Sequence, residues 1–214
     1  MSLTFEDLQL RLVERLAGPL PGPEGQASLS PRPRFGWRPG QVPRDCRHGG
    51  VLLLLYPISG VPHFILTVRN AGLLHHSGQV SLPGGAVEPQ ESFDAAALRE
   101  AHEEVGVDPR SVRIVGGLSP LHVPVSGFVL HPLVGVADSR PPLRREAREV
   151  ARILEIRLDE LCDPSVLGLE TRSSEAGPAE VPYFLLAGEK VWGATAMVLA
   201  EFLWLLGSRP DPWS

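Results

Sequence analysis

The chain has 214 residues, of which 43% are hydrophobic and 21% are charged. That length and composition are enough to bury a sizeable core, and we expect one domain with extensions. The net charge of −5 supplies no general attraction for nucleic acid or for an anionic membrane surface. We therefore predict neither a nucleic-acid nor a membrane partner. An anionic ligand would need a cation or a local group of arginines to offset the protein's own charge.

The cysteines and the N-terminal residues bear on the cellular compartment. Cys46 and Cys162 lie far apart and in no zinc-ligand spacing, which argues against a disulfide scaffold and against a zinc ribbon. Two free thiols suit a reducing environment. Glu6 and Asp7 argue against a secretion signal and against a transit peptide. We expect a cytoplasmic protein.

Residues 1–48 are expected to form a helix followed by an irregular arm. Thr4 resembles a helix cap, and apolar residues recur at helical spacing up to Gly18. Proline, glycine and arginine dominate from there to about residue 48, which favours a solvated linker on the surface. Contact of its arginines with phosphates is the alternative. The main domain is expected over 49–207, and a short tail over 208–214.

Two continuous apolar runs, Val51 to Tyr56 and His63 to Arg69, flank a turn and predict a buried hairpin. Further runs rich in apolar and β-branched residues predict strands at 112–115, 128–136, 153–158 and 183–186. Spacing and cap residues predict helical segments at 92–105, 158–162 and 193–206. We expect residues 168–180 to form a flexible loop. Strands interspersed with a few helices favour an α/β fold, with a mixed sheet flanked by helices.

Three glutamates crowd one face of the helix that is predicted at 92–105. Glu100, Glu103 and Glu104 fall at positions i, i+3 and i+4, so their carboxylates point the same way. Like charges at this spacing destabilise a helix by roughly a few tenths of a kcal/mol per pair. A divalent cation would offset the repulsion, and oxygen ligands fit Mg²⁺ or Mn²⁺ better than zinc. The alternative is a solvated acidic face with Arg99 and other bases nearby.

These acids belong to a longer pattern that resembles the Nudix box at every fixed position. The pattern consists of Gly85, five residues, Glu91, seven residues, Arg99-Glu100-Ala101, one residue, Glu103-Glu104, one residue and Gly106-Val107. The resemblance implies a loop–helix–loop within an α/β/α sandwich that hydrolyses nucleoside diphosphates linked to another moiety. It implies Glu100, Glu103 and Glu104 as metal ligands. It also implies Gly85 as a turn residue, with Arg99 and Glu91 as the charged pair that orients the loop and the acids.

The residues just before the box are similar to the LLTxRSxxLxxHxGQVxFPGG signature of the coenzyme A diphosphatase subgroup. The matching positions are Leu66-Thr67-Val68-Arg69, Leu73, His76, Gly78-Gln79-Val80 and Leu82-Pro83-Gly84-Gly85. The chain departs from the signature at Ile65, Asn70 and Leu82. The segment from Trp192 to Ala196 also resembles the WGxTA start of the last helix in that subgroup.

Several residues of this stretch are candidates for contact with the substrate. Arg69 and His76 beside a glycine-rich turn suit phosphate oxygens. A loop histidine bonded to backbone is the alternative for His76. Gln79, Gly84 and Gly85 complete the predicted substrate-binding set, although Gln79 alternatively shapes the loop instead of touching ligand.

The predicted reaction is Mg²⁺- or Mn²⁺-dependent hydrolysis of coenzyme A or its thioesters, giving 4′-phosphopantetheine or its acyl form and 3′,5′-ADP. One alternative is a Nudix enzyme acting on ADP-ribose, NADH or another dinucleotide, and another is a Nudix-fold module that binds ligand without cleaving it. Glu103, Glu104 and Glu149 are candidates for the general base. A solvated acid among arginines is the alternative for Glu149. The very apolar last helix also predicts a homodimer.

Overall fold

The computed structural model describes residues 4–43, 45–70, 78–174 and 177–213. Its α-helices are α1 (Phe5–Leu16), α2 (Gly22–Ala27), α3 (Phe93–Val105), α4 (Leu158–Leu161) and α5 (Gly193–Leu205). Short 3₁₀ turns span Pro109–Ser111 and Pro164–Val166. The helices predicted at 92–105, 158–162 and 193–206 are confirmed to within a residue at each end.

One large sheet and one small sheet contain the strands. The large sheet consists of β1 (Arg47–Ile58), β2 (Val61–Arg69), β3 (Val80–Ser81), β4 (Gly84–Ala86), β5 (Arg113–Gly117), β6 (Leu121–Val123), β7 (Phe128–Val136) and β8 (Val150–Arg157). The small sheet consists of β9 (Leu167–Ser174), β10 (Gly177–Leu186) and β11 (Glu189–Trp192). The predicted hairpin is confirmed as β1 and β2, which pair antiparallel.

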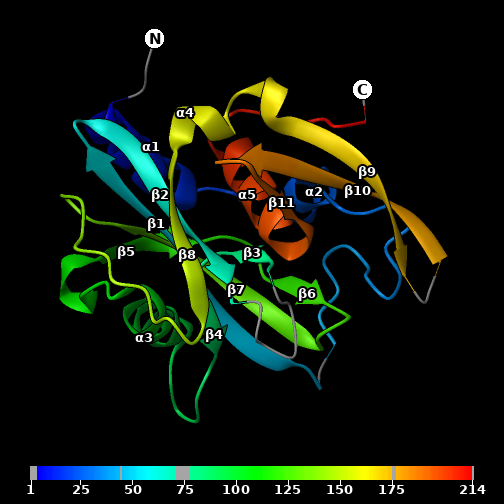
Figure 1. Cartoon of the computed structure of the whole chain (residues 1–214), viewed down its shortest axis with the longest axis horizontal. Helices are drawn as coiled ribbons and strands as arrows, with labels where there is room; N and C mark the ends of the chain where they lie inside the picture. The colour runs from blue at the N-terminus through cyan, green and yellow to red at the C-terminus, as the bar shows by residue number, and fades with distance from the viewer. Residues whose placement is uncertain (1–3, 44, 71–77, 175–176, 214) are drawn as a thin grey trace.

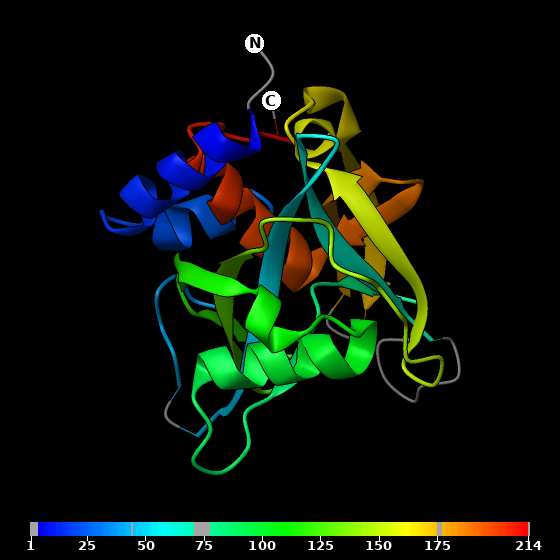
Figure 2. The same cartoon turned by 90° about the vertical axis from the view of Figure 1, so that its left-hand side faces the viewer.

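The large sheet is mixed, as expected. Its main path runs β3-β2-β1-β7-β5, and β1 pairs parallel with β7 but antiparallel with β2 and β4. β8 adds to β2 on the side of the sheet remote from β7. Helix α3 covers one face of this sheet, while α1, α2 and α5 lie over the other (Figure 1 and Figure 2). The chain therefore forms the expected α/β/α sandwich.

The N-terminal segment is packed more closely than we expected. Thr4 caps α1 by accepting a hydrogen bond from the Asp7 N–H at 3.2 Å, and α1 buries Leu8 and Leu12 in the core. The expectation of an irregular surface arm after α1 is wrong over α2 and Leu29, because α2 packs on α5 and Leu29 is fully buried. The Pro- and Gly-rich composition led us to expect a solvated arm, because these contacts are made with parts of the chain that are distant in sequence.

A buried carboxylate in α5 explains why the N-terminal segment lies there. Glu201 is fully buried, and it accepts hydrogen bonds from the Gly22 N–H at 3.2 Å, from Gln26 Nε2 at 2.9 Å and from the Ser119 N–H at 3.0 Å. Such a group is stable in the interior only when its acceptors are satisfied. Helix α2 supplies two of these donors, and this fixes its position against α5.

The apolar surface of α5 that led us to predict a homodimer is covered within the chain itself. All residues from Ala196 to Leu203 are buried, and α2, β10 and β11 pack around the helix. Among the described residues, no helix is long and apolar enough to cross a membrane.

The loop expected over 168–180 is wrong, because β9 and β10 pair antiparallel along most of this segment. Side-chain contacts stabilise this sheet: Thr171 Oγ1 on β9 donates to Glu180 on β10 at 2.6 Å, and the Arg172 guanidinium on β9 lies 4.0 Å from the centroid of the Trp192 ring on β11. The turn-forming residues of this segment led us to expect a loop, whereas side-chain contacts between neighbouring strands stabilise a hairpin here.

Candidate active site

Helix α3 carries the predicted acids, and glycine allows it to lie directly on the sheet. Ser92 caps its first turn by accepting from the Ala95 N–H at 3.2 Å, and Gly106 ends it in the left-handed conformation with φ of 76°. A Cβ atom at Gly50 would lie only 2.5 Å from the Phe93 carbonyl oxygen. The absence of a side chain at Gly50 on β1 therefore allows α3 to pack this closely on the sheet.

Strand β4 brings two glycines beneath the acids. A Cβ atom at Gly85 would lie 2.3 Å from Glu100 Oε1, so only glycine leaves room for this carboxylate. The prediction of Gly85 as a turn residue is wrong, since it pairs with Gly50 within a strand and its role is to permit close approach. Gly84 has a φ of 154°, and its N–H donates to Glu104 Oε2 at 3.3 Å.

Arg99 connects the loop before α3 to two of the acids. Its guanidinium donates to both carboxylate oxygens of Glu91, at 2.9 and 3.1 Å, and its Nη2 also donates to the Ala86 carbonyl at 3.0 Å. Its Nη1 donates to Glu100 at 2.9 Å and to Glu103 at 3.2 Å. The hydrogen bonds from Arg99 hold the pKa of Glu91 below its ordinary value. The pair therefore fastens the loop to the helix.

Glu104 is the most buried of the three acids, with a relative exposure of 3%. Burial raises its pKa to about 7, an effect that the Arg69 charge and the Gly84 N–H oppose. Arg69 Nη1 lies 3.7 Å from Glu104 Oε1. Burial also raises the pKa of Glu100, against the effect of Arg99. The charge of Glu149 adds to both upward shifts of pKa, as the smallest of the causes.

The three acids share one helix, but their carboxylates point to different partners. Glu100 and Glu103 bind Arg99, whereas Glu104 faces Gly84 and Arg69. Within the described part of the chain, no three His, Cys, Asp or Glu side chains are gathered as a ready metal site. The donor chemistry nevertheless fits a hard divalent cation, because all the donors are carboxylate oxygens and their charges repel one another.

Glu149 lies in the connection between β7 and β8, at an exposed position just before β8. Backbone hydrogen bonds tie this connection to α3, from the Glu146 N–H to the Glu104 carbonyl at 2.8 Å and from the Arg144 N–H to the Val105 carbonyl at 2.9 Å. The structure thereby brings the segment that carries Glu149 against the end of α3, although the two are far apart in sequence.

Sequence reasoning missed the residues that hold the start of this connection. Tyr56 is fully buried, and its hydroxyl donates to Glu155 at 2.8 Å, while Arg140 donates to the same carboxylate at 2.8 and 2.6 Å. The Arg140 bonds keep the pKa of Glu155 below its ordinary value. No local pattern could have revealed this cluster, because its members come from three separate segments of the chain.

Of the remaining predicted substrate residues, Arg69 ends β2 and Gln79 directly precedes β3. The Arg69 N–H donates to the Gln79 carbonyl at 2.9 Å, and the Gly78 N–H donates to the Arg69 carbonyl at 3.2 Å. Through its backbone, Gln79 thus shapes the strand that presents Arg69. His76 lies outside the described residues.

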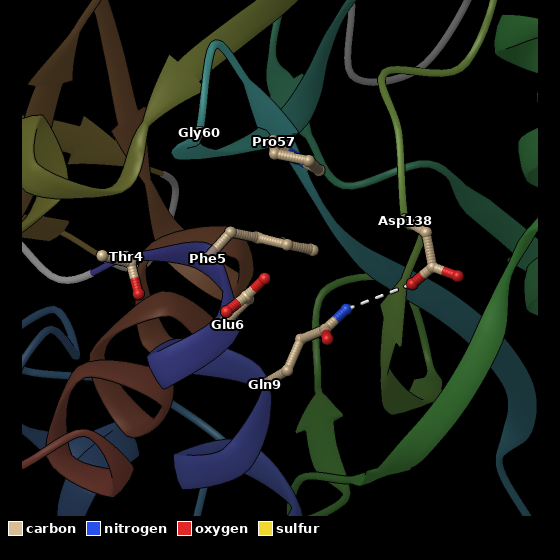
Figure 3. Close-up of a pocket in the computed structure, with 7 residues that line it drawn as sticks. All are labelled: Thr4, Phe5, Glu6, Gln9, Pro57, Gly60 and Asp138. Carbon is tan, nitrogen blue, oxygen red and sulfur yellow. Dashed lines mark hydrogen bonds between the residues drawn. The ribbon is translucent and has the colours of Figure 1, made fainter.

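A separate cleft of about 640 Å³ lies between the start of α1 and the β1–β2 turn (Figure 3). Its lining includes Phe5, Gln9, Pro57 and Asp138, and Gln9 Nε2 donates to Asp138 Oδ1 at 3.3 Å. None of the predicted site residues lines this cleft. We therefore place the candidate active site at the acids of α3 and not here.

Comparison with known proteins gives the family to which this α/β/α sandwich with its acid-bearing helix belongs. A family model described as the NUDIX domain matches residues 47–172. The chain belongs to the Nudix family and is a Nudix hydrolase. Members of this family generally use divalent metal ions.

The chain is similar to relatives that are named uncharacterized Nudix hydrolase NudL. It is 33% identical to that of Photorhabdus laumondii over 164 residues, which cover 76% of this chain and 87% of the relative. It is 36% identical to that of Citrobacter koseri over 155 residues, which cover 70% of this chain and 78% of the relative.

Solved structures of other Nudix proteins are more distant. A MutT/nudix family protein from Enterococcus faecalis has 17% identity and a TM-score of 0.49, covering 82% of this chain and 69% of that one. The NUDIX domain of Shewanella oneidensis NrtR, complexed with ADP ribose, has 15% identity and a TM-score of 0.45, covering 59% and 81%.

Proposed function

We propose that this Nudix hydrolase cleaves the pyrophosphate bond of coenzyme A or its thioesters, with Mg²⁺ or Mn²⁺ bound by Glu100, Glu103 and Glu104. The observation that carries the proposal is the packing of Glu100 against Gly85 and of Glu104 against Gly84, with Arg69 beside Glu104. An acidic protein needs such a cation to bind a pyrophosphate, because the negative charges would otherwise repel.

Arg69 supports a phosphate-bearing substrate. Its Nε is buried and has no hydrogen-bond partner in the described structure, and its side chain is 31% exposed. A buried donor without a partner is costly, so an incoming acceptor is favoured at this position. A phosphate oxygen suits the planar, permanently charged guanidinium. The signature that surrounds Arg69 in the sequence supports coenzyme A as the source of that phosphate.

The proposed chemistry is attack of water on one phosphorus of the pyrophosphate. When bound, the metal ion would neutralise phosphate charge and lower the pKa of the attacking water. Glu149 would accept the water proton as the new O–P bond forms and the bridging P–O bond breaks. Arg69 would hold a phosphate oxygen, while Arg99 and Glu91 keep the loop and the acids in place. The products are 4′-phosphopantetheine, or its acyl form, and 3′,5′-ADP.

A comparison of substrates tests the proposal. Coenzyme A, an acyl-CoA, ADP-ribose and NADH are each incubated with enzyme and Mg²⁺, and kcat/KM is measured. We expect the coenzyme A compounds to be cleaved most efficiently, and E104Q to lose that activity while keeping its fold. Preferential cleavage of ADP-ribose or NADH would contradict the substrate assignment. Binding of coenzyme A without turnover of any compound would contradict the proposal of an enzyme site here.

A further inference from the structure

Asn70 follows β2 directly and fastens the connection between β7 and β8. Its backbone N–H donates to the Glu149 carbonyl at 2.8 Å, and its side-chain Nδ2 donates to the Ala147 carbonyl at 2.8 Å. Both are short, well-formed hydrogen bonds. Two bonds from one residue, to carbonyls two positions apart, fix the orientation of this segment as well as its location.

A β-bulge brings Asn70 to this position. Val68 pairs with Arg152, but Arg69 pairs with Val150, so the register of β2 and β8 shifts between these two residues of β2. Bulges bend a strand and redirect the residues that follow it. Asn70, which follows Arg69, therefore faces the segment before β8 that contains Glu149.

The same segment is tied from its other side to α3. The Glu146 N–H donates to the Glu104 carbonyl at 2.8 Å, and the Glu149 N–H donates to the Glu146 carbonyl at 3.1 Å. Glu149 is thus held between Asn70 on one side and the last turn of α3 on the other. The side chain of Glu149 is exposed, so its backbone attachments are what restrict its position.

We propose that Asn70 is a positioning residue that acts through Glu149: its side-chain amide holds residues 147–149 so that the Glu149 carboxylate faces the acids of α3. The inference rests on the proposed pyrophosphate hydrolysis. Asn70 is one of the positions at which the chain departs from the signature, which has Ser or Ala there. Alanine has no amide to donate, and serine is shorter, so this attachment belongs to the sequence of this chain.

A double-mutant cycle tests whether Asn70 acts through Glu149. We measure kcat and KM with Mg²⁺ and coenzyme A for the wild type, N70A, E149Q and N70A/E149Q. Removing a positioned proton acceptor is expected to lower kcat about 100-fold in E149Q. N70A is expected to lower kcat about tenfold through misplacement, with little change in KM. The double variant should be no slower than E149Q, whereas losses that multiply would overturn the proposal.

A matched control separates this effect from a general loosening of the connection. Gln9 also holds the β7–β8 connection through a side-chain amide, which donates to Asp138 at 3.3 Å near its start. We expect Q9A to keep the kcat of the wild type. A loss in Q9A as large as that in N70A would contradict a specific role for Asn70.

Hydrogen exchange of the metal-free protein gives a second readout that needs no substrate. We expect the peptide that covers residues 143–150 to exchange faster in N70A than in the wild type and in E149Q. Unchanged exchange would contradict the attachment itself, and faster exchange with an unchanged kcat would contradict its effect on catalysis. A wild type that cleaves no coenzyme A would instead contradict the proposed substrate, and the exchange result would stand independently.

Discussion

Arg99 binds Glu91 through two parallel hydrogen bonds, from Nε to Oε1 at 2.9 Å and from Nη2 to Oε2 at 3.1 Å. The remaining guanidinium nitrogen reaches Glu100 and Glu103. The Arg99 guanidinium therefore connects the loop before α3 to two of the acids proposed to bind metal, and its positive charge offsets part of their mutual repulsion.

Replacing Arg99 with lysine tests the need for this geometry. Lysine keeps the positive charge but lacks the planar fork, so R99K is expected to lower kcat/KM about tenfold or more. R110K is the control, because Arg110 also makes a two-point contact, with Asp108, but at an exposed site. Steady-state kinetics measure kcat/KM for both variants. Equal activity of R99K and the wild type would show that charge alone suffices.

Adding one methyl group at Gly85 should displace Glu100. The new Cβ would lie 2.3 Å from Glu100 Oε1, so the carboxylate must move, and we expect G85A to lower kcat about 100-fold. G117A is the matched control, since its Cβ would meet nothing closer than 3.5 Å. Mn²⁺ binding, followed by electron paramagnetic resonance, should also weaken in G85A. Unaltered kinetics and Mn²⁺ affinity in G85A would refute the close-approach argument.

The buried carboxyl of Glu104 predicts a specific dependence of stability on pH. Its pKa is raised from 4.5 to about 7, so the folded protein binds more protons at this site than the unfolded chain between these values. Its contribution to the free energy of unfolding is therefore present at low pH and is lost as pH rises through that window. E104Q removes this loss. In the presence of a chelator, the free energy of unfolding of E104Q relative to that of the wild type should therefore rise by about 3 kcal/mol between about pH 4 and pH 8.

Urea unfolding at several pH values measures this difference. E103Q is the comparison, because Glu103 sits on the same helix with a side-chain exposure of 57%. We expect the difference between E103Q and the wild type to change much less with pH. Parallel stability curves for E104Q and the wild type would contradict the effect of burial on Glu104.

Glu201 should contribute strongly to stability and only indirectly to activity. Glu201→Ala would leave three donors, on Gly22, Gln26 and Ser119, without their buried acceptor. We expect a loss of about 3 kcal/mol or more in the free energy of unfolding. E14A, at an exposed position of α1, is the control and should change stability little. A small effect of E201A would show that water replaces the carboxylate without cost.

Local patterns in the sequence predicted the central elements of the fold. The apolar runs of β1 and β2, and the cap and stop residues of α3, are local signals, and each predicted element is found. The β9–β10 hairpin and α2 were missed because their stability comes from partners distant in sequence. Arg172 needs Trp192, and α2 needs the buried Glu201, neither of which a local window contains.

The sequence likewise predicted some features of the candidate site and not others. The spacing of Glu100, Glu103 and Glu104 predicts that they share one helical face, and their positions on α3 agree with this. The sequence could not show that Gly85 acts through close approach to Glu100. It also gave no sign that Asn70 fastens the connection that carries Glu149, because that contact follows from a shift in strand register.

Analysis of the reaction products by mass spectrometry, after incubation with Mg²⁺ and coenzyme A, tests the proposed function most directly. We predict two products, 4′-phosphopantetheine and 3′,5′-ADP, and no products in the presence of a chelator or with E104Q. Recovery of intact coenzyme A from the wild type with Mg²⁺ and with Mn²⁺ would contradict the proposed function.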